Sequence, residues 1–358
     1  MFAPTAAARE KLEILRQAQD DRIWIPRRNS RIVCRAIMKI FSDSKLTDAA
    51  AKLLVEGVAP HEVVLPRIPA ASVLAESECD PAFADVEIAF GQPDIASIEQ
   101  SERLRWVHLA SAGFTRYDTA EFRALAAARG LIVTNSSAVY AEACAEHVFA
   151  FMLAQSRRLP LALATQTPSW TPEWFHLRTT STLLHGQRVV ILGFGSIAAH
   201  LVKLLAPFEM KITALRRKQR GDEGVAVVTP ENLSTALSEA DHVVNILPGN
   251  ADSVHFIDAT RLAEMKPGAV FYNIGRGTTV EQSALAQALR SGHLAAAWLD
   301  VTDPEPLPDG HMLLSAPNCF ITPHTAGGQR EESEALVRHF LANFRRYLDG
   351  TPLHDRIM

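Results

Sequence analysis

The sequence predicts an α/β protein with two doubly wound parallel sheets and an active-site cleft between two domains. Short apolar runs alternate with helix-like segments along most of the chain, which is typical of parallel strands joined by covering helices. One apolar run ends in a glycine-rich turn that leads directly into a helical pattern. The length of 358 residues is sufficient for two domains of ordinary size.

Two sets of strands are predicted, one in each half of the chain. The first set lies at residues 36–41, 61–66, 84–90, 104–110 and 131–135, with helices expected at 48–56, 94–100 and 119–128. A long apolar helix is expected over residues 141–158, as a domain hinge or a subunit interface. The second set lies at residues 189–194, 211–216, 242–247, 269–275, 295–301 and 319–324, before an amphipathic helix at 331–350.

The glycine turn, Gly-Phe-Gly-Ser-Ile-Ala at residues 193–198, is the most informative stretch. Gly193 permits a tight turn, Gly195 lets the backbone approach a pyrophosphate, and Ala198 is small enough for a helix to pack on the strand. The phosphates would lie at the positive end of that helix. The turn therefore predicts a Rossmann-like dinucleotide site at Gly193, Gly195, Ser196 and Ile197, although small residues at such a corner can also serve packing alone.

The strand after the glycine turn ends in Arg216, Arg217 and Lys218. An acidic residue normally stands there and holds the adenine ribose 2′-hydroxyl of NAD. Guanidinium groups instead suit a 2′-phosphate, because they offer forked, permanently charged donors. We therefore expect NADP(H) as the preferred cofactor and NAD(H) as an alternative; the competing interpretation is a solvated basic turn.

Composition excludes several classes of partner. With 47% hydrophobic and 21% charged residues and a net charge of -4, the chain has no general attraction to nucleic acid or to an anionic membrane. It contains no apolar run long enough to cross a bilayer, and its amino terminus lacks the apolar core of a secretory signal. A cytoplasmic protein is expected.

The cysteines argue against disulfides and metal binding. Cys34, Cys79, Cys144 and Cys319 are far apart and form no Cys-x-x-Cys pair, so reduced thiols are expected. Cys144 and His147 are spaced for one helical face, but no second pair of ligands accompanies them. No metal site is predicted.

Three ionisable residues follow predicted strands of the second set: Arg276, Glu305 and His324. Open parallel sheets bind their ligands at this edge. Arg276 could bind the carboxylate of a 2-keto acid and polarise its carbonyl, while His324 could protonate the forming alkoxide. Glu305 could orient the imidazole and favour its protonated form. Taken singly, each residue also has a purely structural interpretation, as a strand cap or a loop residue.

Together, the motifs GFGSIA, NIGRG, LDVTDPEPLP and ITPHTAGG resemble the D-isomer-specific 2-hydroxyacid dehydrogenase family in their order and spacing. The resemblance covers roughly residues 38–358. The short chain and its basic turn are most similar to the NADP-using glyoxylate/hydroxypyruvate reductases. This implies a 2-keto acid reductase in which the nicotinamide provides the hydride.

The resemblance also implies roles for individual residues. It makes Arg276 the substrate-binding arginine, His324 the acid/base and Glu305 the partner of the imidazole. The loop whose backbone N–H groups receive the substrate carboxylate would consist of Ser111, Ala112 and Gly113. Further contacts to the cofactor are implied for Leu247, Pro248 and Asp300, in addition to those of Arg216 and Arg217 at the ribose. Asn273 is implied as the asparagine that precedes the catalytic arginine.

Gln92 and two tryptophans keep alternative interpretations. Gln92 follows a strand and either hydrogen-bonds the substrate, where it would influence specificity, or caps the next helix. Trp170 and Trp174 either close over the active site, within one chain or across a dimer, or anchor the crossover between the two sets of strands.

The predicted organisation assigns residues 36–137 plus 329–358 to a flavodoxin-like substrate-binding domain and 138–328 to the dinucleotide-binding domain. Residues 1–35 are charged and poor in apolar residues, so we expect a disordered or loosely attached extension. The expected partners are a small 2-keto or 2-hydroxy acid and a second copy of the chain in a homodimer.

Two further functions remain open. A dehydrogenase fold can serve as a dinucleotide-sensing regulatory protein, and a related site can oxidise another small anion such as phosphite. The complete set of Arg276, Glu305 and His324 favours catalysis over sensing, because a sensor does not need all three side chains.

Overall fold

The computed structural model describes residues 37–67, 79–166 and 168–358. These residues form two compact units: a first unit that takes the chain up to Val139 together with Gln329–Met358, and a second unit, Tyr140–Gly328. The extension predicted over residues 1–35 lies outside the described residues. The homodimer involves a second chain and stays a prediction.

The first unit contains a parallel five-stranded sheet with the order β2-β1-β3-β4-β5. The sheet reverses its direction of growth between β1 and β3, so the carboxyl ends of these two strands flank a topological switch point. The strands are β1 (Lys39–Ser42), β2 (Glu62–Val64), β3 (Ile88–Gly91), β4 (Trp106–Leu109) and β5 (Ile132–Thr134). The helices are α2 (Asp48–Val58), α3 (Ile95–Gln100), α4 (Ala120–Arg129) and α12 (Glu332–Asp349).

Local signals determine where these helices begin. The side chains of Thr47, Asp94 and Thr119 each accept a hydrogen bond from a backbone N–H group in the first turn of α2, α3 and α4. Gly130 ends α4 in the left-handed region at φ 61°, where a residue without Cβ is favoured. Because the cap of α3 is Asp94, the interpretation of Gln92 as its cap is wrong.

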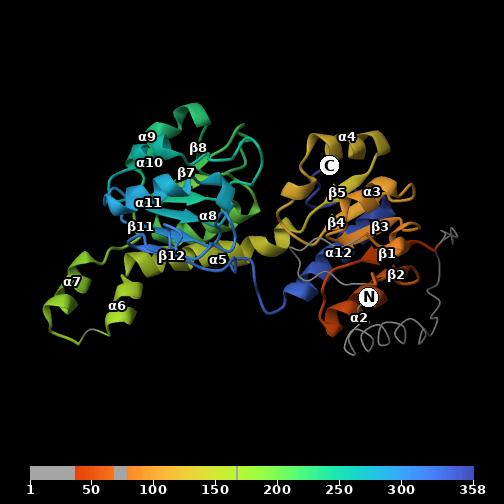
Figure 1. Cartoon of the computed structure of the whole chain (residues 1–358), viewed down its shortest axis with the longest axis horizontal. Helices are drawn as coiled ribbons and strands as arrows, with labels where there is room; N and C mark the ends of the chain where they lie inside the picture. The colour runs from red at the N-terminus through yellow and green to blue at the C-terminus, as the bar shows by residue number, and fades with distance from the viewer. Residues whose placement is uncertain (1–36, 68–78, 167) are drawn as a thin grey trace. The chain divides into compact units, whose positions relative to one another are not determined.

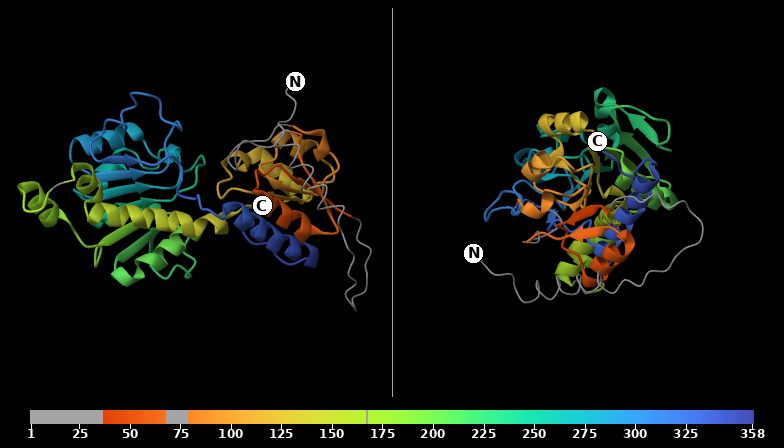
Figure 2. Two further views of the ribbon diagram at one scale, coloured as in Figure 1. Left: turned by 90° about the horizontal axis from the view of Figure 1, so that it is seen from below. Right: turned by 90° about the vertical axis from the view of Figure 1, so that its right-hand side faces the viewer.

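The final helix, α12, completes the first unit. It packs beside α2 (Figure 2). Gly57 of α2 lies so close to Leu341 that a Cβ atom there would collide with the leucine side chain. Phe340 of α12 is fully buried and stacks on Phe90 and Trp106 of the sheet, with ring centroids 4.6 and 5.2 Å apart. Residues distant in the sequence therefore share one aromatic core.

The second unit contains a parallel seven-stranded sheet with the order β12-β11-β10-β9-β6-β7-β8. Its switch point lies between β6 and β9, as in Rossmann folds. The strands are β6 (Arg188–Leu192), β7 (Lys211–Leu215), β8 (Ala226–Val228), β9 (His242–Asn245), β10 (Val270–Asn273), β11 (Ala296–Leu299) and β12 (Cys319–Ile321). Helices α8 (Ser196–Leu205), α9 (Leu233–Glu239), α10 (Ala259–Glu264) and α11 (Gln282–Arg290) cover the sheet (Figure 1).

The long helix α5 (Ser137–Ser156) begins in the first unit and continues in the second. Its buried residues Val148, Phe151 and Met152 belong to the core, and Phe151 contacts Trp298 of β11 at a centroid distance of 4.8 Å. Within the described part of the chain, no helix combines the length and the apolar character needed to cross a membrane.

Two helices that were not predicted follow α5: α6 (Leu159–Thr165) and α7 (Pro172–Thr180). Figure 1 shows them extending from the end of α5, away from the second sheet. Exposed apolar side chains lie on these helices and in the segment between them, namely Leu159, Leu161, Leu163, Trp170 and Phe175. Trp170 is 76% exposed and contacts Trp174 at a centroid distance of 4.6 Å, so the two rings pack on each other.

The prediction of two parallel sheets covered by helices is confirmed. Each predicted strand is present and overlaps its expected range, mostly shortened at its ends. Three strands extend one residue beyond the range: β6 begins at Arg188, β1 ends at Ser42 and β3 ends at Gly91. The edge strand β8 was not predicted.

The aromatic stack leads to a stability prediction. Phe340→Ala should lower the free energy of unfolding by about 3–5 kcal/mol, because it removes a buried ring between two others and leaves a cavity. Phe175→Ala, at a side chain that is 54% exposed, should change it by less than about 0.5 kcal/mol. Urea denaturation followed by tryptophan fluorescence measures both. Equal effects of the two substitutions would contradict the proposed packing.

Candidate active site

The glycine turn joins β6 to α8 in the second unit. Gly193 has φ 97°, a conformation that residues with a Cβ rarely adopt. Gly195 is the N-cap of α8, and no side chain caps the helix. A Cβ at Gly195 would meet no heavy atom within 4 Å, while Ala198 is fully buried against the sheet. Open space before uncapped N–H groups, at the start of a ten-residue helix, fits the pyrophosphate of a dinucleotide.

Arg216 follows β7 and is held by two carboxylates. Its Nη1 lies 2.8 Å from Glu223 Oε1 and 3.4 Å from Asp222 Oδ1. Glu223 is buried and also accepts hydrogen bonds from the backbone N–H groups of Arg220 and Gly221. These hydrogen bonds, above all the one from the Arg220 N–H group, lower the pKa of Glu223 to about 2. Its carboxylate therefore stays ionised.

The surroundings of Arg216 differ from a simple basic turn. Among the described residues, its ion pairs all use Nη1, so Nη2 and Nε are not engaged by a carboxylate. Arg217 is exposed and pairs with Asp252 at 3.1 Å. The sequence predicted the two cations but missed the acidic side chains that orient them, since these come from later turns of the chain.

Two buried asparagines connect the loops that follow β9 and β10. Asn245 donates to Asn273 Oδ1 at 3.0 Å and to Thr279 Oγ1 at 2.7 Å, and it accepts from the N–H group of Leu247 at 3.3 Å. The carbonyl of Arg276 accepts from Asn273 Nδ2 at 3.2 Å and from Thr279 Oγ1 at 2.6 Å. The Leu247–Pro248 loop and the backbone of Arg276 are thereby fixed to each other.

The two residues that flank Arg276 must be glycines, because backbone atoms of neighbouring loops approach them closely. A Cβ at Gly275 would lie 2.6 Å from the carbonyl oxygen of Leu247. One at Gly277 would collide with the backbone of Thr302. Arg276 is thus flanked by two glycines, whose lack of a Cβ allows the loops that contain Leu247 and Thr302 to approach closely.

Arg276, Glu305 and His324 are brought together at the carboxyl edge of the second sheet. His324 Nδ1 lies 2.5 Å from Glu305 Oε1. Burial lowers the pKa of Arg276, and the nearby carboxylate of Glu305 acts in the opposite direction. Burial raises the pKa of Cys144 to about 12, which keeps this thiol neutral beside the arginine. A cation, a carboxylate and an imidazole therefore share one polar site.

Asp300 organises the loop that carries His324. Its carboxylate is buried and accepts from Thr322 Oγ1 at 2.6 Å and from the N–H groups of Thr325 and Ala326 at 2.8 and 2.9 Å. The carbonyl of Asp300 accepts from the N–H group of His324 at 2.9 Å. His324 itself has φ 51°, an uncommon conformation for a residue with a side chain. The predicted contact of Asp300 with the nicotinamide stays a prediction.

The remaining predicted residues lie in the first unit. Gln92 follows β3, and its Nε2 donates to Ser111 Oγ at 2.7 Å. Ser111 Oγ in turn donates to the carbonyl of Gly113 at 2.5 Å. The buried carboxamide of Asn135, which the sequence interpretation missed, donates to the carbonyl of Ala112 at 2.6 Å. Its position directly after a strand is the signal that could have identified it.

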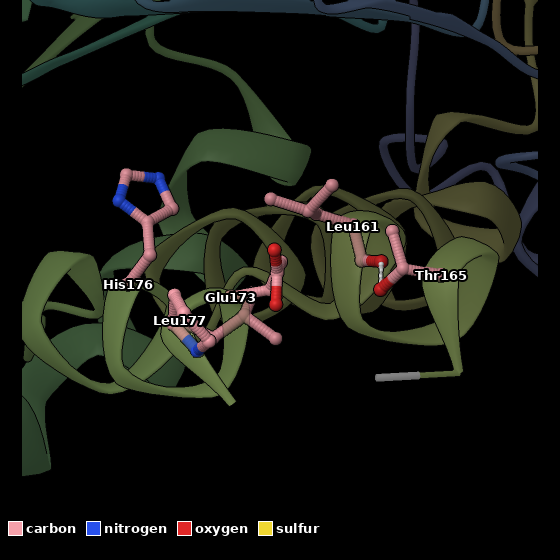
Figure 3. A pocket seen from close by; sticks show the side chains of 6 residues that line it. Leu161, Thr165, Glu173, His176 and Leu177 are labelled. Carbon is pink, nitrogen blue, oxygen red and sulfur yellow. Dashed lines mark hydrogen bonds between the residues drawn. The ribbon is translucent and has the colours of Figure 1, made fainter. Parts of the chain in front are cut away.

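Among the described residues, no group of three or more histidine, cysteine and acidic side chains is arranged to hold a metal. A hollow of about 310 Å³ lies between α6 and α7, lined by Leu161, Thr165, Pro172, Glu173, His176 and Leu177 (Figure 3). None of the predicted site residues lines it, so it is separate from the polar site around Arg276.

Comparisons with known proteins agree with this geometry. The family model described as D-isomer specific 2-hydroxyacid dehydrogenase, NAD binding domain, matches residues 149–326. Glyoxylate/hydroxypyruvate reductase B of Citrobacter koseri is 33% identical over 75% of this chain and 83% of its own length. The chain belongs to the D-isomer-specific 2-hydroxyacid dehydrogenase family.

Other proteins match to different extents. An uncharacterised protein of Corynebacterium melassecola is 37% identical, over 54% of this chain and 63% of its own length. The crystal structure of an NADPH-dependent glyoxylate/hydroxypyruvate reductase from Sinorhizobium meliloti, in complex with NADP and malonate, is 25% identical. It covers 90% of this chain and 97% of its own, with a TM-score of 0.68. As a 2-hydroxyacid dehydrogenase, the chain is an oxidoreductase with a nicotinamide dinucleotide-binding unit.

Proposed function

We propose that this 2-hydroxyacid dehydrogenase reduces a small 2-keto acid, of the size of glyoxylate or hydroxypyruvate, and prefers NADPH. The observation that carries the proposal is the 2.5 Å contact between His324 and Glu305 beside the guanidinium of Arg276. The names of relatives, which include glyoxylate/hydroxypyruvate reductases, support a small keto acid as the substrate class.

Each side chain of the site has a distinct task in this reaction. When bound, NADPH supplies the hydride that reduces the keto carbon. The guanidinium of Arg276 binds the substrate carboxylate and polarises the carbonyl oxygen. Glu305 Oε1 accepts a hydrogen bond from His324 Nδ1–H. This leaves Nε2 as the atom that donates a proton to the forming alkoxide. Glu305 also stabilises the imidazolium before transfer.

The remaining anchor for the substrate carboxylate is the loop of Ser111, Ala112 and Gly113. Its backbone N–H groups would act as neutral donors. The complete set of Arg276, Glu305 and His324 favours catalysis over a dinucleotide-sensing role.

NADPH preference rests on Arg216. Its Nη1 is fixed by the buried carboxylate of Glu223, and the other guanidinium nitrogens have no carboxylate partner among the described residues. A guanidinium that is already oriented loses less side-chain entropy when it binds a 2′-phosphate. The exposed Arg217 adds a second cation to the same turn.

The proposal is tested first on the unmodified protein. Oxidation of NADPH, and separately of NADH, is followed by absorbance with glyoxylate, hydroxypyruvate, pyruvate and a bulkier 2-keto acid. We expect the highest kcat/KM with NADPH and one of the two smallest acids. Turnover that favours the bulky acid would refute the proposed substrate class, and absence of turnover with every acid would refute the reductase.

His324→Ala should lower kcat by about 10²–10⁴-fold, the usual contribution of a positioned proton donor. The dissociation constant of NADP⁺, measured by calorimetry, should stay unchanged. His185→Ala removes a 62% exposed imidazole from the same unit and serves as the control. A loss of kcat below tenfold would assign the proton to another group.

Arg216→Ala should lower kcat/KM for NADPH by about 10–100-fold and leave the value for NADH within about threefold, because a charged hydrogen bond to the 2′-phosphate is lost. Arg220→Ala removes the same charge from the same turn without disturbing the pair with Glu223. Equal losses with both cofactors would contradict a role of Arg216 in discrimination.

A further inference from the structure

One polar network joins the carboxyl ends of four neighbouring strands in the first sheet. The strands β1, β3, β4 and β5 lie side by side and run parallel. A buried polar side chain stands one or two residues after the end of each: Asp43, Gln92, Ser111 and Asn135. The loop that follows β4 lies in the middle of this row, and it is the loop proposed to receive the substrate carboxylate.

Gln92 acts on this loop through Ser111. Its Nε2 donates to Ser111 Oγ at 2.7 Å, and Ser111 Oγ donates its only hydrogen to the carbonyl of Gly113 at 2.5 Å. Gln92 and Ser111 are 6% and 5% exposed. Because its only hydrogen is used inside the loop, the Ser111 hydroxyl shapes the loop and does not donate to a ligand.

Gln92 is itself fixed from the other side of the switch point. Its backbone N–H donates to Asp43 Oδ1 at 2.8 Å. Gly91 has φ 144°, and a Cβ there would collide with the same carboxylate oxygen. A glycine and a buried aspartate thus fix the position of the backbone from which the Gln92 side chain extends.

Asn135 holds the neighbouring peptide group. Its Nδ2 donates to the carbonyl of Ala112 at 2.6 Å, and the asparagine is 2% exposed. Its own backbone N–H donates to the carbonyl of Asp355 at 3.0 Å, and its Oδ1 accepts from the N–H group of Ser137 at 3.3 Å. Asn135 is therefore immobilised at both its backbone and its side chain.

These bonds determine where the loop presents its donors. In a trans peptide the C=O and N–H groups point in opposite directions within one plane. Fixing the carbonyls of Ala112 and Gly113 toward the network therefore turns the N–H groups of Gly113 and Phe114 away from it. Across the described part of the chain, the N–H groups of Ala112, Gly113 and Phe114 have no hydrogen-bond partner, and all three residues are half-buried. Adjacent half-buried N–H groups of this kind form an anion-binding concavity.

We infer that Gln92 and Asn135 are positioning residues that orient the backbone N–H groups of residues 112–114 toward a substrate carboxylate. The inference rests on the proposed function, because it takes the 2-keto acid as the anion. It replaces the interpretation of Gln92 as a direct contact to the variable end of the substrate. Gln92 acts on the part that all 2-keto acids share, so it should affect affinity for all of them equally.

The test uses a matched pair of serines in the full-length protein. Ser111→Ala removes the hydroxyl that connects Gln92 to the loop. Ser97→Ala removes a buried hydroxyl of the same unit that bonds Asp94 instead. Calorimetry measures the binding of oxamate, an unreactive 2-keto acid analogue, to the protein saturated with NADPH. We expect about tenfold weaker binding for Ser111→Ala and no change for Ser97→Ala.

Asn135→Ala and Gln92→Ala extend the test to the two positioning residues. Each should weaken oxamate about tenfold and raise KM for glyoxylate and hydroxypyruvate by the same factor, with kcat within about threefold. The double variant Gln92→Ala, Ser111→Ala should bind no more weakly than Ser111→Ala alone, because both substitutions break one relay. Binding of NADP⁺ should be unaffected. If Asn135→Ala does not fold, the comparison of Ser111→Ala with Ser97→Ala still tests the inference.

The outcomes separate this inference from the proposed function. Unchanged oxamate affinity in Ser111→Ala, in a protein that still reduces 2-keto acids, overturns the inference alone. A changed ratio of glyoxylate to hydroxypyruvate in Gln92→Ala overturns it as well, because it assigns Gln92 to specificity. An unmodified protein that neither binds oxamate nor reduces a keto acid overturns both.

Discussion

Where a parallel strand ends, its last peptide groups lose the regular partners of the sheet, and any of them that stay buried must find others. Much of the site depends on how this chain meets that requirement. In the second unit, Asn245, Asn273 and Asp300 hold the loops after β9, β10 and β12. In the first, Ser111 and Asn135 do the same for the loop after β4. The side chains that satisfy the backbone also determine the positions of the reacting groups.

The reacting groups depend on each other electrostatically. Partial burial makes charge more costly at Arg276, while the carboxylate of Glu305 stabilises that charge and contacts His324. Because the medium around half-buried groups is less polarisable than water, these interactions are stronger than they would be on the surface. The neutral thiol of Cys144 lies beside the arginine without adding an anion. A single carboxylate thus stabilises the charge of the guanidinium and contacts the imidazole.

The sequence was sufficient for the architecture because alternation of apolar runs and glycine at a strand end are local signals. It also indicated Arg276, Glu305 and His324 as candidates, since each lies at or shortly after the carboxyl end of a predicted strand. Hydrogen bonds and ion pairs between residues distant in the sequence were not predictable from it. Glu223 was not expected beside Arg216, and one of the two interpretations of Gln92 made it a helix cap, although Asp94 performs that task. Which polar residues meet in such loops depends on the path of the folded backbone.

Helices α6 and α7 were missed for a different reason. The connector that contains them is rich in threonine and proline, and neither helix has a buried residue that would produce a periodic apolar face. Short helices without such a face carry little signal in a single sequence.

The stack of Phe340 on Phe90 and Trp106 has a consequence for synthesis of the protein on the ribosome. The first unit needs α12, whereas every residue of the second unit, Tyr140–Gly328, precedes α12 in the chain. Domains fold as units once their residues have emerged. The dinucleotide-binding unit can therefore form while the sheet translated before it still lacks its aromatic cover, so the earlier of the two sheets is completed later.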